Sequence, residues 1–284
     1  MKVLVTGYTG QLGYDVVQRG LKNGLSIVGI GSKELDITNE TEVHRYVKEL
    51  NPDAIIHCAA YTAVDKAEDD KNKCWDINVE GTKHLANAAS EIAAKFVYIS
   101  TDYVFNGESE KPFKETDNVS PIGYYGLTKY EGEKIVKQLL DKCFIIRISW
   151  VFGLNGKNFV KTMLRLAETK NELSVVGDQI GSPTYTYDLA KLIIDMVQSD
   201  KYGVYHASNE GYCSWAEFAQ EIFAQADANV KVKSITTEEY PTRAVRPKNS
   251  RMAKEKLSAN GFTPLPKWQD ALKHYLTELK HEVK

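Results

Sequence analysis

The chain has 284 residues, and its 36 Lys and Arg nearly balance its 38 Asp and Glu, which gives a formal net charge of −2 at neutral pH. A composition with 43% hydrophobic and 26% charged residues is typical of a globular protein and argues against a disordered chain. No apolar run approaches the roughly 18 residues that a transmembrane helix needs. A chain of this length can bury about three quarters of its unfolded surface, as one large domain or two smaller ones.

Residues 1–6 form a short apolar stretch that runs directly into a glycine and lacks the features of a secretory signal, so we expect a cytoplasmic protein. Its four cysteines, Cys58, Cys74, Cys143 and Cys213, are far apart in the sequence and include no CxxC pair, which predicts reduced thiols. The six histidines include no HExxH pair, and no other spacing is typical of a metal site. We therefore expect no catalytic metal.

The first 150 residues alternate β-rich runs with longer helical stretches. This alternation predicts an α/β fold with a Rossmann-type, doubly wound parallel sheet, in which ligands bind beyond the carboxyl ends of the strands. The predicted strands are residues 2–6, 26–30, 54–57, 96–100 and 144–149. The predicted helices are residues 11–23, 42–50, 69–93 and 125–140.

After about residue 150 the elements become shorter, which predicts a dinucleotide-binding domain over 1–150 and a smaller, mainly substrate-binding region over 151–284, partly interleaved with the first. Helices are expected at 187–198, 215–226 and 267–280. Residues 231–284 hold 12 Lys and Arg against 6 Asp and Glu. This basic excess indicates either a solvated face or a local field that favours an anionic substrate, whereas nucleic-acid binding has little support.

A glycine-rich stretch joins the first predicted strand to the first helix. Glycines at positions 7, 10 and 13 allow a tight turn, a close backbone approach to a pyrophosphate, and close packing of helix and sheet. The position after a strand and before a helix is the context that such a motif requires. The residues expected to bind the dinucleotide here are Gly7, Thr9, Gly10, Gln11, Leu12 and Gly13.

The end of the second strand indicates which nicotinamide cofactor is used. An NAD site usually carries an acidic residue there, whereas this chain has Ser32 and Lys33, followed by Glu34. A hydroxyl and a cation at this place favour NADPH over NADH, although the use of both remains open.

Thr101, Tyr125 and Lys129 are the candidate catalytic residues. Tyr125 and Lys129 are four positions apart and share one face of a helix. A nearby ammonium is expected to lower the pKa of the tyrosine from its usual value near 10 towards the range of general acid-base catalysis. With a nicotinamide bound, Tyr125 would protonate the oxygen of a ketone that receives a hydride, and Thr101 would donate a second hydrogen bond to that oxygen.

The same YxxxK pattern recurs at Tyr130 and Lys134. Five residues rotate about 140° around a helix, so the two pairs cannot face one site. We favour the first pair because it lies at the helix start, nearer the strand ends.

The glycine loop, Thr101 and the Tyr125–Lys129 pair resemble the extended short-chain dehydrogenase/reductase family. Finer stretches resemble the members of this family that act on dTDP-linked keto sugars; these are residues 9–13, 35–38, 58–65, 78–82, 100–105, 147–153, 178–184 and 246–247. The resemblance implies reduction of dTDP-4-dehydro-6-deoxy-L-mannose to dTDP-L-rhamnose, the last step of dTDP-rhamnose biosynthesis.

The resemblance also implies roles for further residues. Asp36 and Ile37 would contact the adenine of the cofactor, and Ala59, Ala60, Tyr61, Asn78 and Tyr125 would complete its site. Lys129 would also hold the nicotinamide ribose. Asp102, Tyr103 and Trp150 would contact the deoxysugar. Asn158, Lys161 and Arg246 are candidates for the diphosphate. Core packing is the alternative for each of them.

Two other functions stay open at this point: a nucleotide-sugar epimerase or dehydratase, and a noncatalytic, cofactor-binding regulatory subunit. Some relatives dimerise through carboxylates that share a magnesium ion. The matching position here is Asp15, a shorter side chain, so we do not carry that metal over. A homodimer is one alternative for the oligomeric state.

Overall fold

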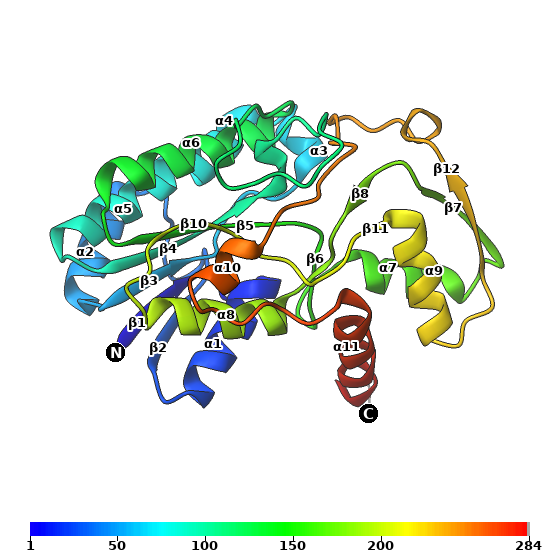
Figure 1. Ribbon diagram of the computed structural model, residues 1–284. Coiled ribbons are helices and arrows are strands. Elements are labelled where there is room, and N and C mark those ends of the chain that lie inside the picture. Colours follow the sequence, from blue (N-terminus) through cyan, green and yellow to red (C-terminus); the bar gives the residue numbers. More distant parts are fainter. Residues whose placement is uncertain (283–284) are drawn as a thin grey trace.

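A parallel sheet of six strands forms the centre of the molecule, which the computed structural model describes over residues 1–282 (Figure 1). The strand order is β10-β5-β4-β3-β1-β2, and every neighbouring pair is parallel. The strands are β1 (Lys2–Thr6), β2 (Ser26–Ile30), β3 (Ala54–His57), β4 (Lys95–Thr101), β5 (Cys143–Ile148) and β10 (Gly203–His206). The chain order reverses between β1 and β3, which is where ligands bind in open sheets of this kind.

Helices cover both faces of this sheet because its strands are apolar on both sides. One face packs against α2 (Glu40–Leu50), α5 (Gly81–Glu91) and α6 (Tyr124–Leu139), and the other against α1 (Gln11–Lys22) and α8 (Thr186–Val197) (Figure 1). Alternation along β1 shows the two layers: Val3 and Val5 belong to one buried cluster and Leu4 to the other. The predicted fold class is confirmed.

The helix predicted over residues 69–93 is divided in the structure. It consists of α4 (Lys71–Trp75), a π-helical turn at Asp76–Glu80 and α5, and the short helix α3 (Val64–Ala67) precedes it. The π-helical turn brings the Asn78 amide against the backbone of Tyr61, where it accepts from the Tyr61 N–H at 2.8 Å and donates to the Tyr61 carbonyl at 3.2 Å. Local sequence periodicity does not encode this tertiary pairing.

The second half of the chain forms a smaller lobe and also completes the main layers through α8 and β10 (Figure 1). Helix α10 (Glu255–Ala259) packs against β10 in the main layers. The elements of the smaller lobe are β6 (Val151–Phe152), α7 (Phe159–Ala167), β7 (Glu172–Val176), β8 (Ile180–Gly181), β9 (Thr184–Tyr185), β11 (Cys213–Ser214), α9 (Trp215–Gln225), β12 (Lys231–Ile235) and α11 (Trp268–Glu282). Aromatic rings fill its core, among them Phe152, Tyr185, Phe218 and Tyr275. The boundary at residue 150 stays a prediction.

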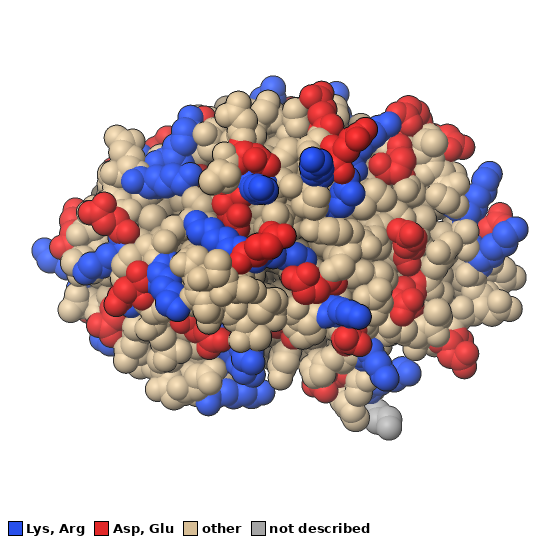
Figure 2. Space-filling view, viewed as in Figure 1, with Lys and Arg blue, Asp and Glu red and all other residues tan. Residues whose placement is uncertain are grey.

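Basic and acidic side chains are intermixed on the face of the molecule shown in Figure 2. The basic excess in residues 231–284 is balanced by acidic side chains from earlier in the chain. The pairs include Lys231–Glu172, Arg243–Asp69, Arg246–Asp65, Lys248–Asp178 and Lys254–Glu210. Within residues 1–282, no helix has the length and apolar character that crossing a bilayer requires.

A buried ionic network joins α6 to β4, β5 and β10. The Arg147 guanidinium donates to both carboxylate oxygens of Glu133, at 2.8 and 2.7 Å, and the Ser100 hydroxyl donates to the same carboxylate at 2.6 Å. Both members of the ion pair are almost completely buried. Removing one partner of such a pair typically costs about 3–5 kcal/mol, because an uncompensated charge is left in the interior.

His206, at the end of β10, extends this network and supplies a test by pH. Its Nδ1 lies 3.2 Å from the Ala253 carbonyl and therefore carries the proton, and its Nε2 faces Arg147 Nη1 at 3.4 Å. Burial, aided by the Arg147 charge, lowers the pKa of His206 to about 3. The unfolded chain binds a proton at this residue below about pH 6.5, whereas the folded chain does not. Stability is therefore lost as the pH falls from that value towards about 3.

We expect His206→Asn, which keeps the hydrogen bond to Ala253, to flatten the acid dependence of the free energy of unfolding. The slope should decrease by up to about 1.4 kcal/mol per pH unit, the value for one proton. Urea denaturation between about pH 7 and about pH 5 measures this slope. The exposed His281 offers the control His281→Asn, and equal slopes for the two variants would contradict the assignment.

Candidate active site

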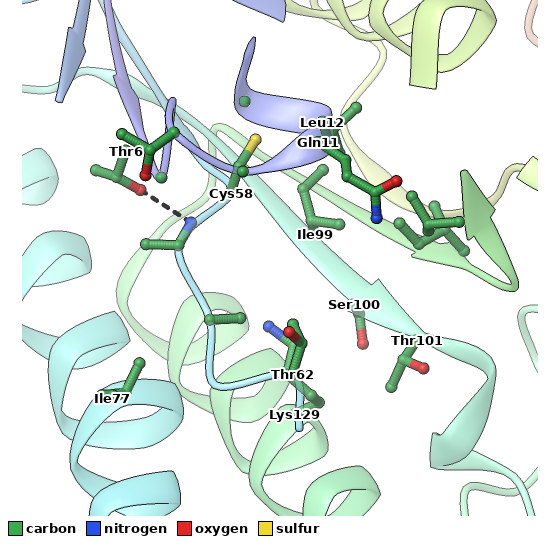
Figure 3. A pocket seen from close by; sticks show the side chains of 18 of the residues that line it. Thr6, Gln11, Leu12, Cys58, Thr62, Ile77, Ile99, Ser100, Thr101 and Lys129 are labelled. Atoms are coloured by element: carbon green, nitrogen blue, oxygen red, sulfur yellow. Dashed lines mark hydrogen bonds between the residues drawn. The ribbon is translucent and has the colours of Figure 1, made fainter. Parts of the chain in front are cut away.

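A cavity of about 600 Å³ opens at the carboxyl ends of β1, β3, β4 and β5 (Figure 3). Predicted residues that line it comprise the glycine loop with Thr9, Gln11 and Leu12, then Ser32, Asp36, Ile37, Ala59, Ala60, Thr101, Asp102, Tyr103, Tyr125, Lys129 and Trp150. Residues that are more than a hundred positions apart in the sequence therefore share one cavity.

Gly7 and the start of α1 shape the end of the cavity suited to phosphate. Gly7 has a φ of +71°, and a Cβ there would lie 2.6 Å from the Ala59 nitrogen, so only glycine fits. Gly10 is the N-cap of α1 and supplies no side-chain cap, which leaves the first N–H groups of the helix available to an anion. A Cβ on Gly10 would lie 3.3 Å from its nearest neighbour, the Gly7 carbonyl oxygen, so glycine is less strictly required there.

A chain of hydrogen bonds fixes the ends of β1 and β3 beneath this loop. The Thr82 hydroxyl donates to the Asn78 carbonyl at 2.7 Å, so it accepts from His57 Nε2 at 3.1 Å. The Thr6 hydroxyl then donates to His57 Nδ1 at 2.7 Å and accepts from the Ala59 N–H at 3.3 Å (Figure 3). Burial, with the Lys129 charge, lowers the pKa of His57 to about 3, so the ring is neutral and holds these partners in one orientation.

Four polar residues follow β2, and their side chains have different surroundings. Ser32 and Asp36 line the cavity, while Lys33 is exposed beside it. The Glu34 carboxylate accepts from the Gly31 N–H at 2.8 Å. Hydrogen bonds from Thr38 lower the pKa of Asp36. The acidic residue that follows Lys33 is thus already bonded to the strand end.

Tyr61 and Asn78 lie behind the wall of the cavity. Their paired backbone and amide hydrogen bonds hold the turn that carries Ala59 and Ala60, and the Tyr61 hydroxyl points to Asp70 at 3.4 Å. These two residues support the cavity from outside rather than lining it.

Thr101 and Tyr125 meet at the mouth of the cavity. Thr101 ends β4, donates to Asp102 Oδ1 at 3.0 Å and accepts from the Tyr103 N–H at 3.2 Å, and its side chain is also hydrogen-bonded to Tyr125. The Tyr103 ring meets Tyr125 edge to face, with 5.7 Å between centroids. Tyr125, in the first turn of α6, is therefore held by partners on β4 and the segment that follows it.

The expectation that the pKa of Tyr125 lies below its usual value is wrong. Burial raises this pKa, and the neighbouring Asp102 charge raises it further, while the Thr101 hydrogen bond opposes them. Lys129 is 2% exposed, and its Nζ lies over the ring of Tyr98, 4.1 Å from the centroid. Burial lowers the pKa of Lys129 to about 7.

The second YxxxK pair faces away from the cavity. Tyr130 packs against the cluster of Val104, Phe105 and Phe113, and Lys134 lies over the Tyr130 ring at 5.3 Å. The rotation around the helix accounts for this difference.

Trp150 and Asp102 also line the cavity. Trp150 has a φ of +48° and stacks on Trp215 with 3.7 Å between ring centroids. Asp102 is 2% exposed, and burial raises its pKa to about 6. No pattern in the sequence predicts that Trp150 stacks on Trp215, which lies in the smaller lobe.

Asn158, Lys161 and Arg246 bind groups of the protein itself. The Asn158 side chain accepts from the Lys161 N–H, the start of α7, and donates to the Gly153 carbonyl. Lys161 Nζ donates to the carbonyls of Leu154 and Gly156. The Arg246 guanidinium holds the Asp65 carboxylate through two bonds of 3.1 and 2.8 Å. None of the three is among the residues that line the cavity.

Residues that the sequence reasoning missed include Cys58, Ser149 and Asp65. Cys58 and Ser149 directly follow β3 and β5 and line the cavity, so the rule of strand ends could have found them. Asp65 is identified only by its ion pair with Arg246.

Asp15 is buried and accepts a hydrogen bond from Thr186, which joins α1 to α8. The Asp15 carboxylate thus points into the protein. Within residues 1–282, no group of three or more His, Cys, Asp or Glu side chains could hold a metal ion.

The parallel sheet, the glycine loop at its switch point, and Thr101, Tyr125 and Lys129 around one cavity are the features of an extended short-chain dehydrogenase/reductase. The family model for the RmlD substrate binding domain matches residues 1–281. The chain therefore belongs to the RmlD family.

Individual relatives resemble the chain over its whole length. The spore coat polysaccharide biosynthesis protein SpsK of Bacillus subtilis is 42% identical over 98% of this chain and 97% of its own. A crystal structure of a dTDP-4-dehydrorhamnose reductase from Clostridium acetobutylicum has a TM-score of 0.97 at 42% identity, and covers 99% of this chain and 100% of its own. A crystal structure of the Bacillus anthracis dTDP-4-dehydrorhamnose reductase in complex with NADP has a TM-score of 0.95 at 45% identity. It covers 98% of this chain and 99% of its own chain.

The glycines of the loop should differ in what they tolerate. Gly7→Ala combines a strained φ with a clash against Ala59, so we expect loss of folded protein or a fall in stability of several kcal/mol. Gly10→Ala should fold and yet bind NADPH at least roughly tenfold more weakly, because the methyl group stands where a pyrophosphate approaches. Thermal unfolding and fluorescence titration with NADPH measure the two effects. Wild-type affinity in Gly10→Ala would place the phosphates elsewhere.

Proposed function

We propose that this protein uses NADPH to reduce dTDP-4-dehydro-6-deoxy-L-mannose to dTDP-L-rhamnose, through Thr101, Tyr125 and Lys129. The observation that carries the proposal is the meeting of these three side chains in one cavity with the glycine loop. Full-length similarity to dTDP-4-dehydrorhamnose reductases supports the substrate, and the NADP complex of one of them supports the cofactor.

The residues at the cavity fit a dinucleotide. The uncapped N-terminus of α1 and the Gly7 turn would hold the pyrophosphate, Ser32 and Lys33 the 2′-phosphate, and Asp36 and Ile37 the adenosine end. Ala59 and Ala60 leave room for the nicotinamide. Bound NADPH supplies a hydride for the carbonyl carbon of the sugar.

Tyr125 supplies the proton for the carbonyl oxygen. Its raised pKa keeps the phenol protonated at neutral pH, so it can donate. The hydroxyls of Tyr125 and Thr101 would both bond to the carbonyl oxygen, which becomes an alcohol as it takes the phenolic proton. The Lys129 ammonium stabilises the phenolate that remains until solvent returns a proton.

The substrate side of the proposal follows from the shape of the cavity. Tyr103 and Trp150 would enclose the deoxysugar ring, and Asp102 would bind its hydroxyls. Arg246 would hold the diphosphate by exchanging the Asp65 carboxylate for phosphate oxygens, since both offer the same bidentate geometry. Asn158 and Lys161 would act indirectly, by fixing the start of α7.

A homodimer and a cytoplasmic location belong to the same proposal. Tyr14 on α1 and Tyr187 on α8 are 37% and 39% exposed, and exposed aromatic rings on adjacent helices favour a contact between subunits. Light scattering would distinguish the dimer from a particle of 31.9 kDa.

Tyr125→Phe should bind NADPH with an affinity close to that of the wild type, because only one hydroxyl is lost. Turnover should fall by roughly 10²–10⁴-fold, the usual contribution of a positioned proton donor. Tyr130→Phe is the matched control on the same helix and should retain full activity. The measurement is NADPH oxidation at saturating keto sugar, and full activity in Tyr125→Phe would refute the role of Tyr125.

The stoichiometry of NADPH oxidation also tests the reaction class. A reductase consumes one NADPH for each keto sugar, whereas an epimerase or dehydratase regenerates its cofactor within the cycle. Product formation without net loss of NADPH would therefore contradict the proposed function.

Lys33→Glu should reduce kcat/KM for NADPH by roughly tenfold or more and leave kcat/KM for NADH nearly unchanged, since only the 2′-phosphate is repelled. Lys22→Glu makes the same charge change at the exposed end of α1 and is the control. A parallel loss with both cofactors would mean that Lys33 does not select between them.

A further inference from the structure

Lys129 is enclosed by neutral or already paired groups. From its own helix it is faced by Glu133, whose carboxylate binds Arg147 and Ser100. From the segment around the end of β3 it is faced by His57, whose pKa burial lowers to about 3, and by Cys58, whose pKa burial raises to about 12. From α4 it is faced by Cys74, whose thiol pKa burial also raises. Within residues 1–282, no carboxylate forms an ion pair with this ammonium, and Glu133 is paired with Arg147.

The ring face of Tyr98 fills the remaining side. Tyr98 lies in the middle of β4, is fully buried, and presents its ring to Lys129 Nζ with 4.1 Å between the nitrogen and the ring centroid. The Tyr98 hydroxyl donates to the backbone carbonyl of Lys129 at 3.2 Å. One side chain thus contacts both the charged end and the backbone of the same residue.

Gly132 permits this close approach of α6 to β4. A Cβ at position 132 would lie 2.8 Å from Tyr98 Cζ and still closer to its hydroxyl oxygen. The helix can therefore seat Lys129 directly on the ring only because position 132 has no side chain.

We propose that Tyr98 is a positioning residue for the reduction, whose ring holds the Lys129 ammonium in its charged form and directs it into the cavity. This inference rests on the proposed role of Lys129. A ring face suits the task better than a carboxylate would, because it stabilises the cation without neutralising it. The full positive charge stays available to the Tyr125 phenolate and to the cofactor ribose.

The sign of the pH effect follows from this arrangement. Burial lowers the pKa of Lys129 to about 7, and Glu133 opposes this shift. The Tyr98 ring favours the protonated form, so its removal lowers this pKa further. Activity that needs the ammonium is then lost at a lower pH, and the alkaline limb of the pH profile moves in the acid direction.

The experiment compares Tyr98→Leu, which removes the ring, with Tyr98→Phe, which keeps it and loses only the hydroxyl. Phe96→Leu is the matched control, because Phe96 is equally buried, lies two residues earlier on β4 and contacts the same His57 ring. NADPH affinity by fluorescence and kcat with the keto sugar are both measured between about pH 6 and about pH 9.

In Tyr98→Leu the alkaline limb should move down by roughly 0.5–1.5 pH units, and NADPH should bind several-fold more weakly above neutral pH. Tyr98→Phe and Phe96→Leu should keep the limb of the wild type. An unchanged limb and affinity in Tyr98→Leu would overturn the proposal. An equal shift in Tyr98→Phe would assign the effect to the hydroxyl. An equal shift in Phe96→Leu would assign it to a general loosening of the core. Either result rejects the proposal.

Fluorinated phenylalanines at position 98 keep the proposal testable if Tyr98→Leu does not fold. Stepwise fluorination weakens the electrostatic attraction of the ring face for a cation with little change in size. The alkaline limb should then move to lower pH with each added fluorine. A limb that stays at the same pH in all fluorinated variants contradicts the inference. Wild-type NADPH oxidation and the Tyr125→Phe variant are unaffected by this outcome, so failure of the inference is distinguishable from failure of the proposed function.

Discussion

The close backbone contact between Gly7 and Ala59 is the constraint on which the site depends. The carboxyl ends of β1 and β3 meet at the point where the strand order reverses, and the absence of a side chain at position 7 lets the two turns touch. His57 then joins both strand ends to α5 through neutral hydrogen bonds. A wider separation would move the phosphate loop away from the wall that carries the alanines, and a dinucleotide would no longer span both.

Burial sets the pKa values of both Tyr125 and Lys129 in the site. It raises the pKa of Tyr125 and lowers that of Lys129, so a phenol and an amine whose usual pKa values are similar are pushed far apart. The phenol thereby stays a proton donor, while the pKa of the amine is brought to about 7. Nearby carboxylates are prevented from neutralising it, because Glu133 is committed to Arg147.

Much of the fold was predictable because its strands are short, apolar and bounded by glycine or polar residues. The first three strands match the predicted bounds to the residue, and the glycine loop and the Tyr125–Lys129 pair were found from local spacing. The sequence did not reveal contacts between distant segments, such as Trp150 on Trp215, Arg246 on Asp65, or Tyr98 beneath Lys129. Periodicity describes one element at a time, whereas these contacts arise from how elements cross. The expected lowering of the Tyr125 pKa was wrong for the same reason, since burial depends on the whole fold.

Two ion pairs of unequal strength join the segment around residues 243–246 to α3 and the residues that follow it. Arg246 and Asp65 are 24% and 44% exposed and pair through both carboxylate oxygens, whereas Arg243 and Asp69 are 62% and 63% exposed and pair through Oδ1 alone. Salt weakens interactions between exposed charges more than those between partly buried charges, so it weakens the Arg243–Asp69 pair first. The segment is therefore held more firmly at Arg246 than at Arg243, and the salt concentration sets how readily the Arg243 end detaches.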